Sequence, residues 1–139
     1  MAIKKGIYAA SMSIFNEDLS LDIDFTIKHA ERLIKEGLHG SIFFGSTGCA
    51  QLISSNEKKE LIEKLQNNQF RDNFMIGTGN NSLNENIEII KHSLKNGIDR
   101  FLIMPPAYYK YGDEGAYSFY ANLIQKVPES KIILYNFEK

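Results

Sequence analysis

The chain has 139 residues, of which 43% are hydrophobic and 24% are charged, and its formal net charge is −1. This composition is that of an ordinary globular domain, and the near-neutral charge gives no electrostatic reason to bind nucleic acid or an acidic membrane surface. No apolar run approaches the roughly 18 residues of a membrane-spanning helix, and the lone Cys49 cannot form an internal disulfide, which favours a cytoplasmic location.

The first apolar run extends from Ile7 to Met12. It is short and Ser11 interrupts it, so a first strand is a better interpretation than the apolar segment of a signal peptide. Asp22 can cap a helix after this strand, and Gly37 suits the end of that helix. The helix would present on one face the apolar residues Ile23, Ile27, Ala30, Leu33 and Ile34.

The second and third apolar runs, residues 41–44 and 74–76, are also predicted strands. Each is followed by the Ser-x-x-Glu spacing of a capping box, at residues 54–57 and 82–85. In a capping box the serine and the glutamate each accept a hydrogen bond from the other's backbone. An amphipathic helix should therefore begin directly after the serine of each box.

The fourth run, residues 101–104, ends at two prolines, and an amphipathic segment over residues 116–124 follows it. The fifth run is residues 132–134. The predicted order is thus five strands alternating with four helices. Short, continuously apolar strands that alternate with helices indicate a parallel sheet buried on both faces.

Two architectures accept this order. An open, doubly wound sheet of five strands agrees with the length, whereas an eight-stranded (β/α)8 TIM barrel typically needs about 250 residues. The residues at the strand ends and the position of the fifth strand as the last element favour the barrel. We therefore predict an α/β fold in which residues 1–139 form one portion of a catalytic domain, the first five strands and four helices of a truncated TIM barrel.

The residues that follow each predicted strand are rich in hydroxyl groups and glycine and hold few charges. In parallel α/β proteins, ligands bind at these carboxyl ends. Ser46 and Thr47 could hold a carboxylate through their hydroxyls and backbone amides, and Gly48 lets the backbone approach closely. Tyrosines such as Tyr135 can relay protons when they are hydrogen-bonded. The pattern predicts a small, oxygen-rich anionic substrate.

Four segments at successive strand ends resemble the motifs of the dihydrodipicolinate synthase and N-acetylneuraminate lyase family of pyruvate-dependent aldolases. They are Gly45-Ser-Thr-Gly48, Gly77-Thr-Gly-Asn80, Pro105-Pro-Ala-Tyr-Tyr-Lys110 with Asp113-Glu-Gly115, and Ile133-Leu-Tyr-Asn136. Each segment is weak evidence alone, but all four occur in order over the whole chain.

The resemblance implies a class I aldolase, in which a lysine on the sixth strand forms an imine with pyruvate or a related 2-keto acid. It implies that Ser46, Thr47 and Gly48 bind the substrate carboxylate and that Tyr135 shuttles protons. Ser46 and Tyr108 would complete the relay, with Tyr108 reaching a neighbouring subunit's site across a dimer interface. The loop can be aligned two ways, so Tyr109 is the alternative to Tyr108. A homodimer or homotetramer is expected of the full-length enzyme.

Three departures from the family pattern stand out. The sixth-strand lysine is absent from the chain, and the lysines at 110, 131 and 139 are poor substitutes because of their positions. Cys49 occupies the place of the usual glutamate, and Phe137 and Glu138 follow Asn136 in place of a Val-Pro-Ser type of sequence. These departures leave open whether aspartate semialdehyde is the second substrate.

Other features have plainer interpretations. The mixed charges of residues 57–60 are typical of a solvated helix face, and Cys49 is interpreted as a small, semi-buried residue. The three histidines lack the spacing of metal ligands, so no metal site is expected, and neither is any cofactor.

The sequence therefore predicts a Schiff-base-forming lyase or aldolase that is active only in the full-length protein, with this chain inactive alone. A small open-sheet domain that binds an anion without catalysis is the alternative. A regulatory or structural relative that has lost the lysine is a third possibility.

Overall fold

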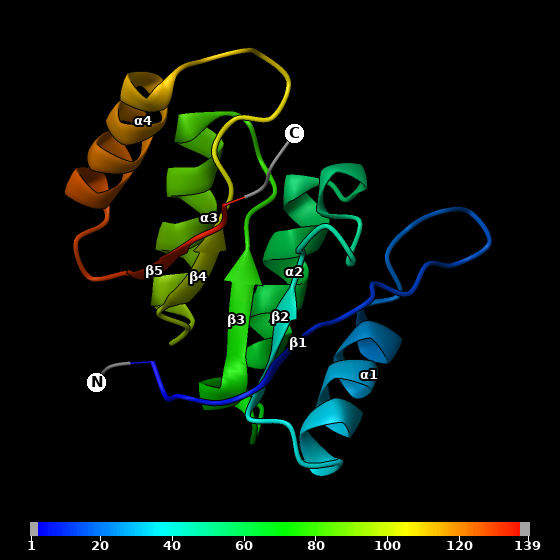
Figure 1. The fold of residues 1–139 in the computed structure, drawn as a ribbon. Coiled ribbons are helices and arrows are strands. Elements are labelled where there is room, and N and C mark those ends of the chain that lie inside the picture. The colour runs from blue at the N-terminus through cyan, green and yellow to red at the C-terminus, as the bar shows by residue number, and fades with distance from the viewer. Residues whose placement is uncertain (1–2, 137–139) are drawn as a thin grey trace.

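The computed structural model describes residues 3–136; the expectations at Phe137, Glu138 and Lys139 lie outside this range. Figure 1 shows five strands alternating with four helices. In chain order the elements are β1 (Tyr8–Ala10), α1 (Ile23–Lys35), β2 (Gly40–Phe43), the 3-10 turn η1 (Ala50–Leu52), α2 (Ser55–Leu65), the 3-10 turn η2 (Arg71–Asn73), β3 (Phe74–Gly77), α3 (Leu83–Lys95), β4 (Arg100–Ile103), α4 (Asp113–Lys126) and β5 (Lys131–Leu134).

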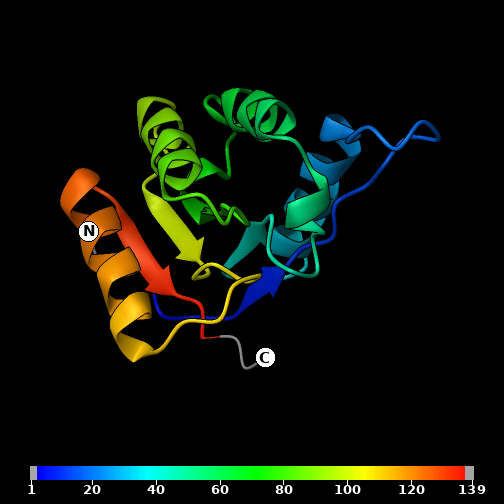
Figure 2. The ribbon, with the colours of Figure 1, turned by 90° about the horizontal axis from the view of Figure 1, so that it is seen from above.

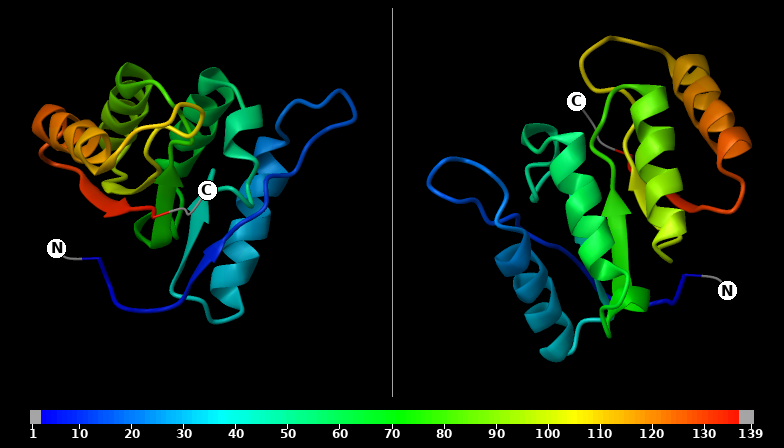
Figure 3. Two further views of the ribbon diagram at one scale, coloured as in Figure 1. Left: turned by 45° about the horizontal axis from the view of Figure 1, so that its top comes forward. Right: turned by 180° about the vertical axis from the view of Figure 1, so that it is seen from behind.

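The sheet is parallel throughout, and its strands lie side by side in chain order, β1-β2-β3-β4-β5. A doubly wound sheet instead reverses its strand order at a switch point. The four helices cover one face of the sheet, and each packs against the next (Figure 3, right). The sheet is curved, with the helices on its convex face (Figure 2). Sequential parallel strands with helices on the outer face are the arrangement of a (β/α)8 barrel, which confirms the predicted fold class for the part of the chain described.

The hydrophobic core lies between the sheet and the helices. It includes fully buried side chains on the strands, such as Phe43, Phe74 and Phe101, and others on the helices, such as Leu61 and Ile90. Because side chains alternate across a strand, the strand residues that lie between these core residues face the opposite side of the sheet. None of the helices α1–α4 covers that side (Figure 2). Ile42 and Leu102 are partly exposed on that side.

The predicted helix ends agree closely with the structure. The Asp22 carboxylate accepts a hydrogen bond from the amide of Phe25, and Gly37 follows α1 with a φ of +109°. Ser54 and Glu57 form the complete capping box. The predicted box at Ser82 is only half formed, because Ser82 accepts from the amide of Glu85 without the reciprocal bond from the glutamate side chain.

The strand ends differ slightly from the prediction. β1 contains three residues, because only Tyr8 to Ala10 are in register with β2. Ile7 and Met12, at the two ends of the apolar run, are more than half exposed. None of the helices in residues 3–136 is long and apolar enough to cross a membrane.

The capping box of α2 gives a test of the fold. Ser54→Ala should lower the free energy of unfolding by about 1 kcal/mol at pH 7, because the amide of Glu57 loses its acceptor. Hydrogen bonds from the Ser54 hydroxyl and the Leu21 amide hold the pKa of Glu57 below its usual value. Their contribution is therefore present above the unfolded-state pKa of about 4.3 and is lost as the pH falls through the lowered pKa.

Urea unfolding at pH 7 and at pH 3 measures both effects. The difference between the Ser54→Ala variant and the parent should shrink at the lower pH. Ser55→Ala is the matched control, since Ser55 lies inside α2 and alanine is a good helix residue. An equal loss in the two variants would contradict the capping account.

Candidate functional site

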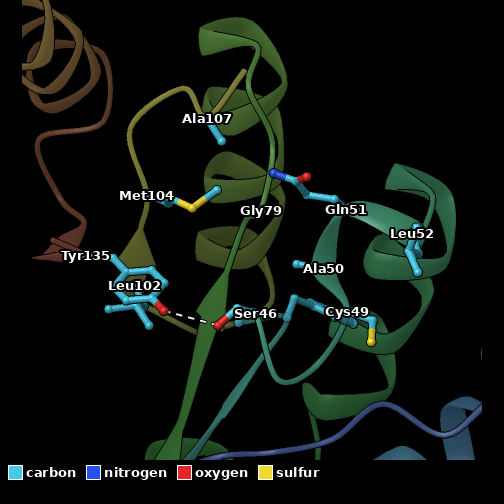
Figure 4. A pocket seen from close by; sticks show the side chains of 12 residues that line it. Ser46, Cys49, Ala50, Gln51, Leu52, Gly79, Leu102, Met104, Ala107 and Tyr135 are labelled. Atoms are coloured by element: carbon cyan, nitrogen blue, oxygen red, sulfur yellow. Dashed lines mark hydrogen bonds between the residues drawn. The ribbon is translucent and has the colours of Figure 1, made fainter. Parts of the chain in front are cut away.

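A pocket of about 470 Å³ lies at the carboxyl ends of the strands (Figure 4). Its walls come from the segments that follow β2 and β3, from β4 with the loop behind it, and from the end of β5. The lining residues are Phe44, Gly45, Ser46, Cys49, Ala50, Gln51, Leu52, Gly79, Leu102, Met104, Ala107 and Tyr135. Most of them are apolar, and the polar side chains among them are the hydroxyls of Ser46 and Tyr135, the amide of Gln51 and the thiol of Cys49.

Ser46 and Tyr135 share a hydrogen bond across the pocket, with 3.1 Å between the two hydroxyl oxygens. Figure 4 shows the two side chains pointing toward one another. They are 89 residues apart in the chain, and either oxygen can be the donor. Tyr135 is held where β5 ends, since its amide donates to the carbonyl of Ile103 at 2.8 Å. The structure thus brings together two of the residues that the sequence predicted for the site.

The backbone around Ser46 is strained. Phe44, which is buried, has a φ of +58°, and Cys49 has a φ of +51°. Left-handed conformations at non-glycine residues cost about 1–3 kcal/mol each and gather at functional sites. Two hydrogen bonds hold the loop, from the amide of Cys49 to the carbonyl of Ser46 and from the hydroxyl of Ser13 to the carbonyl of Gly48. The loop that carries Ser46 is therefore preorganised by its surroundings.

The other predicted site residues lie outside the pocket wall. Gly48 is buried and Thr47 is exposed, and neither lines the pocket. Tyr108 is 82% exposed and makes an edge-to-face contact with Tyr109, with 5.1 Å between the ring centroids. Within residues 3–136, the hydrogen-bond partner of the Ser46 hydroxyl is Tyr135 and not Tyr108.

The expectation for Cys49 is wrong. Cys49 lines the pocket and is exposed, not semi-buried. The expectations for two of the lysines are confirmed: Lys110 is exposed in a loop, and Lys131 lies at the opposite end of the sheet, paired with Asp99. Residues 3–136 contain no group of three or more His, Cys, Asp or Glu side chains that could hold a metal ion.

The interpretation of residues 57–60 as a solvated face is wrong for Lys58, which is fully buried. Its ammonium donates to the carbonyl of Thr78 at 2.7 Å and to the Asn80 side chain at 3.1 Å. Burial lowers the pKa of Lys58 to about 8. A sequence signal existed, because Lys58 falls three and four residues before Leu61 and Ile62, on the apolar face of the helix.

Tyr120 lies in the segment 116–124, for which the sequence predicts an amphipathic helix and no further role. In the structure its hydroxyl donates to the carbonyl of Ile103 at 2.9 Å, the same carbonyl that accepts from the amide of Tyr135. Burial raises the pKa of Tyr120 to about 12, so it stays a neutral donor at physiological pH. α4 thereby stabilises the point at which the chain leaves β4 and β5 to form the pocket.

The chain resembles known proteins over almost all of its length. The model of the dihydrodipicolinate synthetase family matches residues 4–139. The L-threo-3-deoxy-hexylosonate aldolase of Aspergillus niger is 32% identical, over 97% of this chain and 43% of the aldolase. The 4-hydroxy-tetrahydrodipicolinate synthase of Bartonella bacilliformis is 35% identical, over 95% of this chain and 45% of the synthase. The chain thus spans less than half the length of these curated relatives.

Solved structures also resemble the chain over almost all of its length. YagE, a protein of the dihydrodipicolinic acid synthase family from E. coli K12 crystallised in complex with pyruvate, superposes with a TM-score of 0.86 at 28% identity, over 98% of this chain and 46% of YagE. The dihydrodipicolinate synthase of Agrobacterium tumefaciens superposes with a TM-score of 0.88 at 25% identity, over 96% of this chain and 48% of the enzyme. Both comparisons agree with a barrel of which this chain forms the first part.

The burial of Lys58 predicts a distinctive pH dependence. Burial disfavours the protonated form and lowers the pKa to about 8 from its ordinary value of 10.5, so the folded state binds fewer protons than the unfolded state between these two values. The free energy of unfolding should therefore rise with pH in that window by about 1–3 kcal/mol. A Lys58→Met variant should lack this rise.

Denaturant unfolding between pH 7 and pH 10.5 measures the effect as the difference between the parent and the variant. Lys59→Met is the matched control, because Lys59 is partly exposed and pairs with Glu88, and its profile should run parallel to that of the parent. Parallel profiles for the parent and the Lys58→Met variant would contradict the assigned burial.

Proposed function

This chain belongs to the dihydrodipicolinate synthetase family, and we propose that it supplies the keto-acid-binding part of a lyase or aldolase that makes or cleaves a carbon–carbon bond through an imine. The observation that carries the proposal is the hydrogen bond between Ser46 and Tyr135 at the wall of the pocket. It joins a motif that resembles a carboxylate-binding loop to a tyrosine that resembles a proton shuttle.

In the proposed reaction, the amine of a lysine on a sixth strand adds to the keto carbon of pyruvate or a related 2-keto acid. Water leaves, and the resulting protonated imine accepts the electron pair of an adjacent carbon–carbon or carbon–hydrogen bond. The described residues, 3–136, form the five strands β1–β5, and we assign this step to the full-length protein. The part of the chain described here binds the acid and moves protons.

Each site residue has a proposed role. The backbone amides and hydroxyls of Ser46, Thr47 and Gly48 bind the substrate carboxylate, because amides of a tight turn form a concave anion site. Tyr135 takes a proton from the carbon atom next to the imine and passes it along its hydrogen bond to Ser46. The apolar wall formed by residues such as Leu102 and Met104 excludes water and strengthens these polar contacts.

Tyr108 would extend the relay from a neighbouring subunit. Its exposure supports this proposal, since a tyrosine that is 82% exposed is available to a partner. Tyr109, 73% exposed, is the alternative donor from the same loop. We propose that the full-length enzyme is a homodimer or homotetramer, and the lone Cys49 favours a reducing cytoplasm.

The substrate proposal is a 2-keto acid such as pyruvate. The pyruvate complex of YagE supports it, as do the names of the fungal aldolase and the bacterial synthase. The alternative is a domain that binds an anion with the same loop and performs no catalysis. Trapping of the imine distinguishes the two.

Borohydride reduction in the presence of pyruvate gives the test. The chain alone should form no stable adduct, because none of the described residues that line the pocket is a lysine. A chimera in which residues 1–139 are joined to the part of YagE that follows the matched segment should form one adduct, detectable by mass spectrometry of the intact protein.

A matched reaction without pyruvate controls for reduction alone. A stable adduct on residues 1–139 would contradict the proposed division of roles. A folded chimera without any adduct would support the anion-binding alternative.

A further inference from the structure

Lys58 on α2 is a buried ammonium that the proposed reaction does not use. Its side chain is fully buried, and its two hydrogen-bond acceptors are the carbonyl of Thr78 and the side-chain oxygen of Asn80. In the described part of the chain it forms no ion pair within 4 Å, and Glu85 acts on it only through space. Burying a charge without a carboxylate is costly, so the two acceptors must recover a substantial part of that cost.

Both acceptors belong to the loop between β3 and α3. This loop is tied at its other side to α3, where the buried Asn86 accepts from the hydroxyl of Thr78 and donates to the carbonyls of Asn80 and Ser82. Lys58 and Asn86 therefore hold the loop from two neighbouring helices.

The loop in turn holds the next loop along the sheet. The side-chain oxygen of Asn81 accepts a hydrogen bond of 2.8 Å from the amide of Ala107, in the loop between β4 and α4. Ala107 directly precedes Tyr108. The hydrogen bonds of Lys58 and of Asn81 are joined by the backbone of residues 78–81, and together they link α2 to the loop that carries the exposed tyrosines.

Both loops form walls of the pocket. Gly79 and Ala107 line it, and Figure 4 shows Ala107 above Ser46 in that view. Gly79 is tightly confined: its φ is +60°, and a Cβ there would lie 2.2 Å from the Cβ of Ala50. The wall therefore has little room to move unless the loop is released.

We propose that Lys58 is a positioning residue that fixes the β3–α3 loop and, through Asn81, the β4–α4 loop in the geometry that shapes the pocket. An apolar side chain at position 58 could pack in the core, because this position lies on the same buried face of α2 as Leu61, Ile62 and Leu65. What an apolar residue lacks is a charged donor for two oxygens of one loop, and charge-assisted hydrogen bonds are about twice as strong as neutral ones. The proposal concerns the shape of the pocket and does not depend on the proposed function.

Amide hydrogen exchange of the 139-residue chain, followed by NMR, tests the proposal without any substrate. Lys58→Met keeps the length of the side chain and removes the ammonium, and it should lower the protection of the Ala107 amide by about tenfold or more. The Tyr135 amide, bonded to the Ile103 carbonyl, is the internal reference and should keep its protection. Lys59→Met is the matched control and should leave Ala107 unchanged.

A double-mutant cycle with Asn81→Ala tests the link between α2 and the loop that carries Ala107. Asn81→Ala removes the acceptor of the Ala107 amide directly, so adding Lys58→Met to it should lower the protection of Ala107 no further. Lys58→Arg retains charged donors and should keep most of the protection. A packing role predicts the reverse order, with methionine tolerated better than arginine.

The proposal is overturned if Lys58→Met leaves the Ala107 amide as protected as in the parent, or lowers protection equally over the whole sheet. If that variant does not fold, the unchanged chain still decides. The ammonium protons of Lys58 should exchange slowly and show cross-relaxation with Asn80, and free exchange would overturn the proposal. Failure of the chimera to trap pyruvate would remove the proposed function and leave this exchange pattern unaffected.

Discussion

Parallel pairing in chain order is the constraint on which the site depends. It brings the carboxyl end of every strand to the same edge of the sheet, so that short loops from distant parts of the chain meet there. The contact between Ser46 and Tyr135 spans 89 residues of sequence and needs only that β2 and β5 belong to one curved, parallel sheet. The carbonyl of Ile103 sharpens the arrangement, because it receives both the Tyr135 amide and the Tyr120 hydroxyl.

The sequence predicted those parts of the structure that local chemistry determines. Asp22, Ser54 and Gly37 act as expected at helix ends because capping depends on a few neighbouring atoms. The five strands were found because continuous apolar runs indicate burial on both faces. Ser46 and Tyr135 were found because strand ends in such a sheet converge.

Other features depend on distant contacts or on backbone geometry and were missed. The charged neighbours of Lys58 dominate the local pattern and predict a solvated side chain, whereas its acceptors come from the loop after β3, which is distant in sequence. The exposure of Cys49 and its left-handed backbone have no signal in the sequence, because the residue is not a glycine. At Ser82 the Ser-x-x-Glu pattern correctly predicts the hydrogen bond that the serine accepts, but the reciprocal bond to the glutamate side chain is not formed.

The proposed chemistry is divided between this chain and the part of the full-length protein that completes the barrel. We propose as the central claim that Ser46 and Tyr135 move the proton that an imine of pyruvate must exchange. The rate at which the chimera with YagE exchanges the methyl hydrogens of pyruvate in deuterated water measures this step directly and needs no aldehyde partner. Tyr135→Phe and Ser46→Ala should each slow the exchange by about 10²–10⁴-fold, with the double variant no slower than the worse single one and imine trapping retained. Exchange at the parent rate in either variant would contradict the claim.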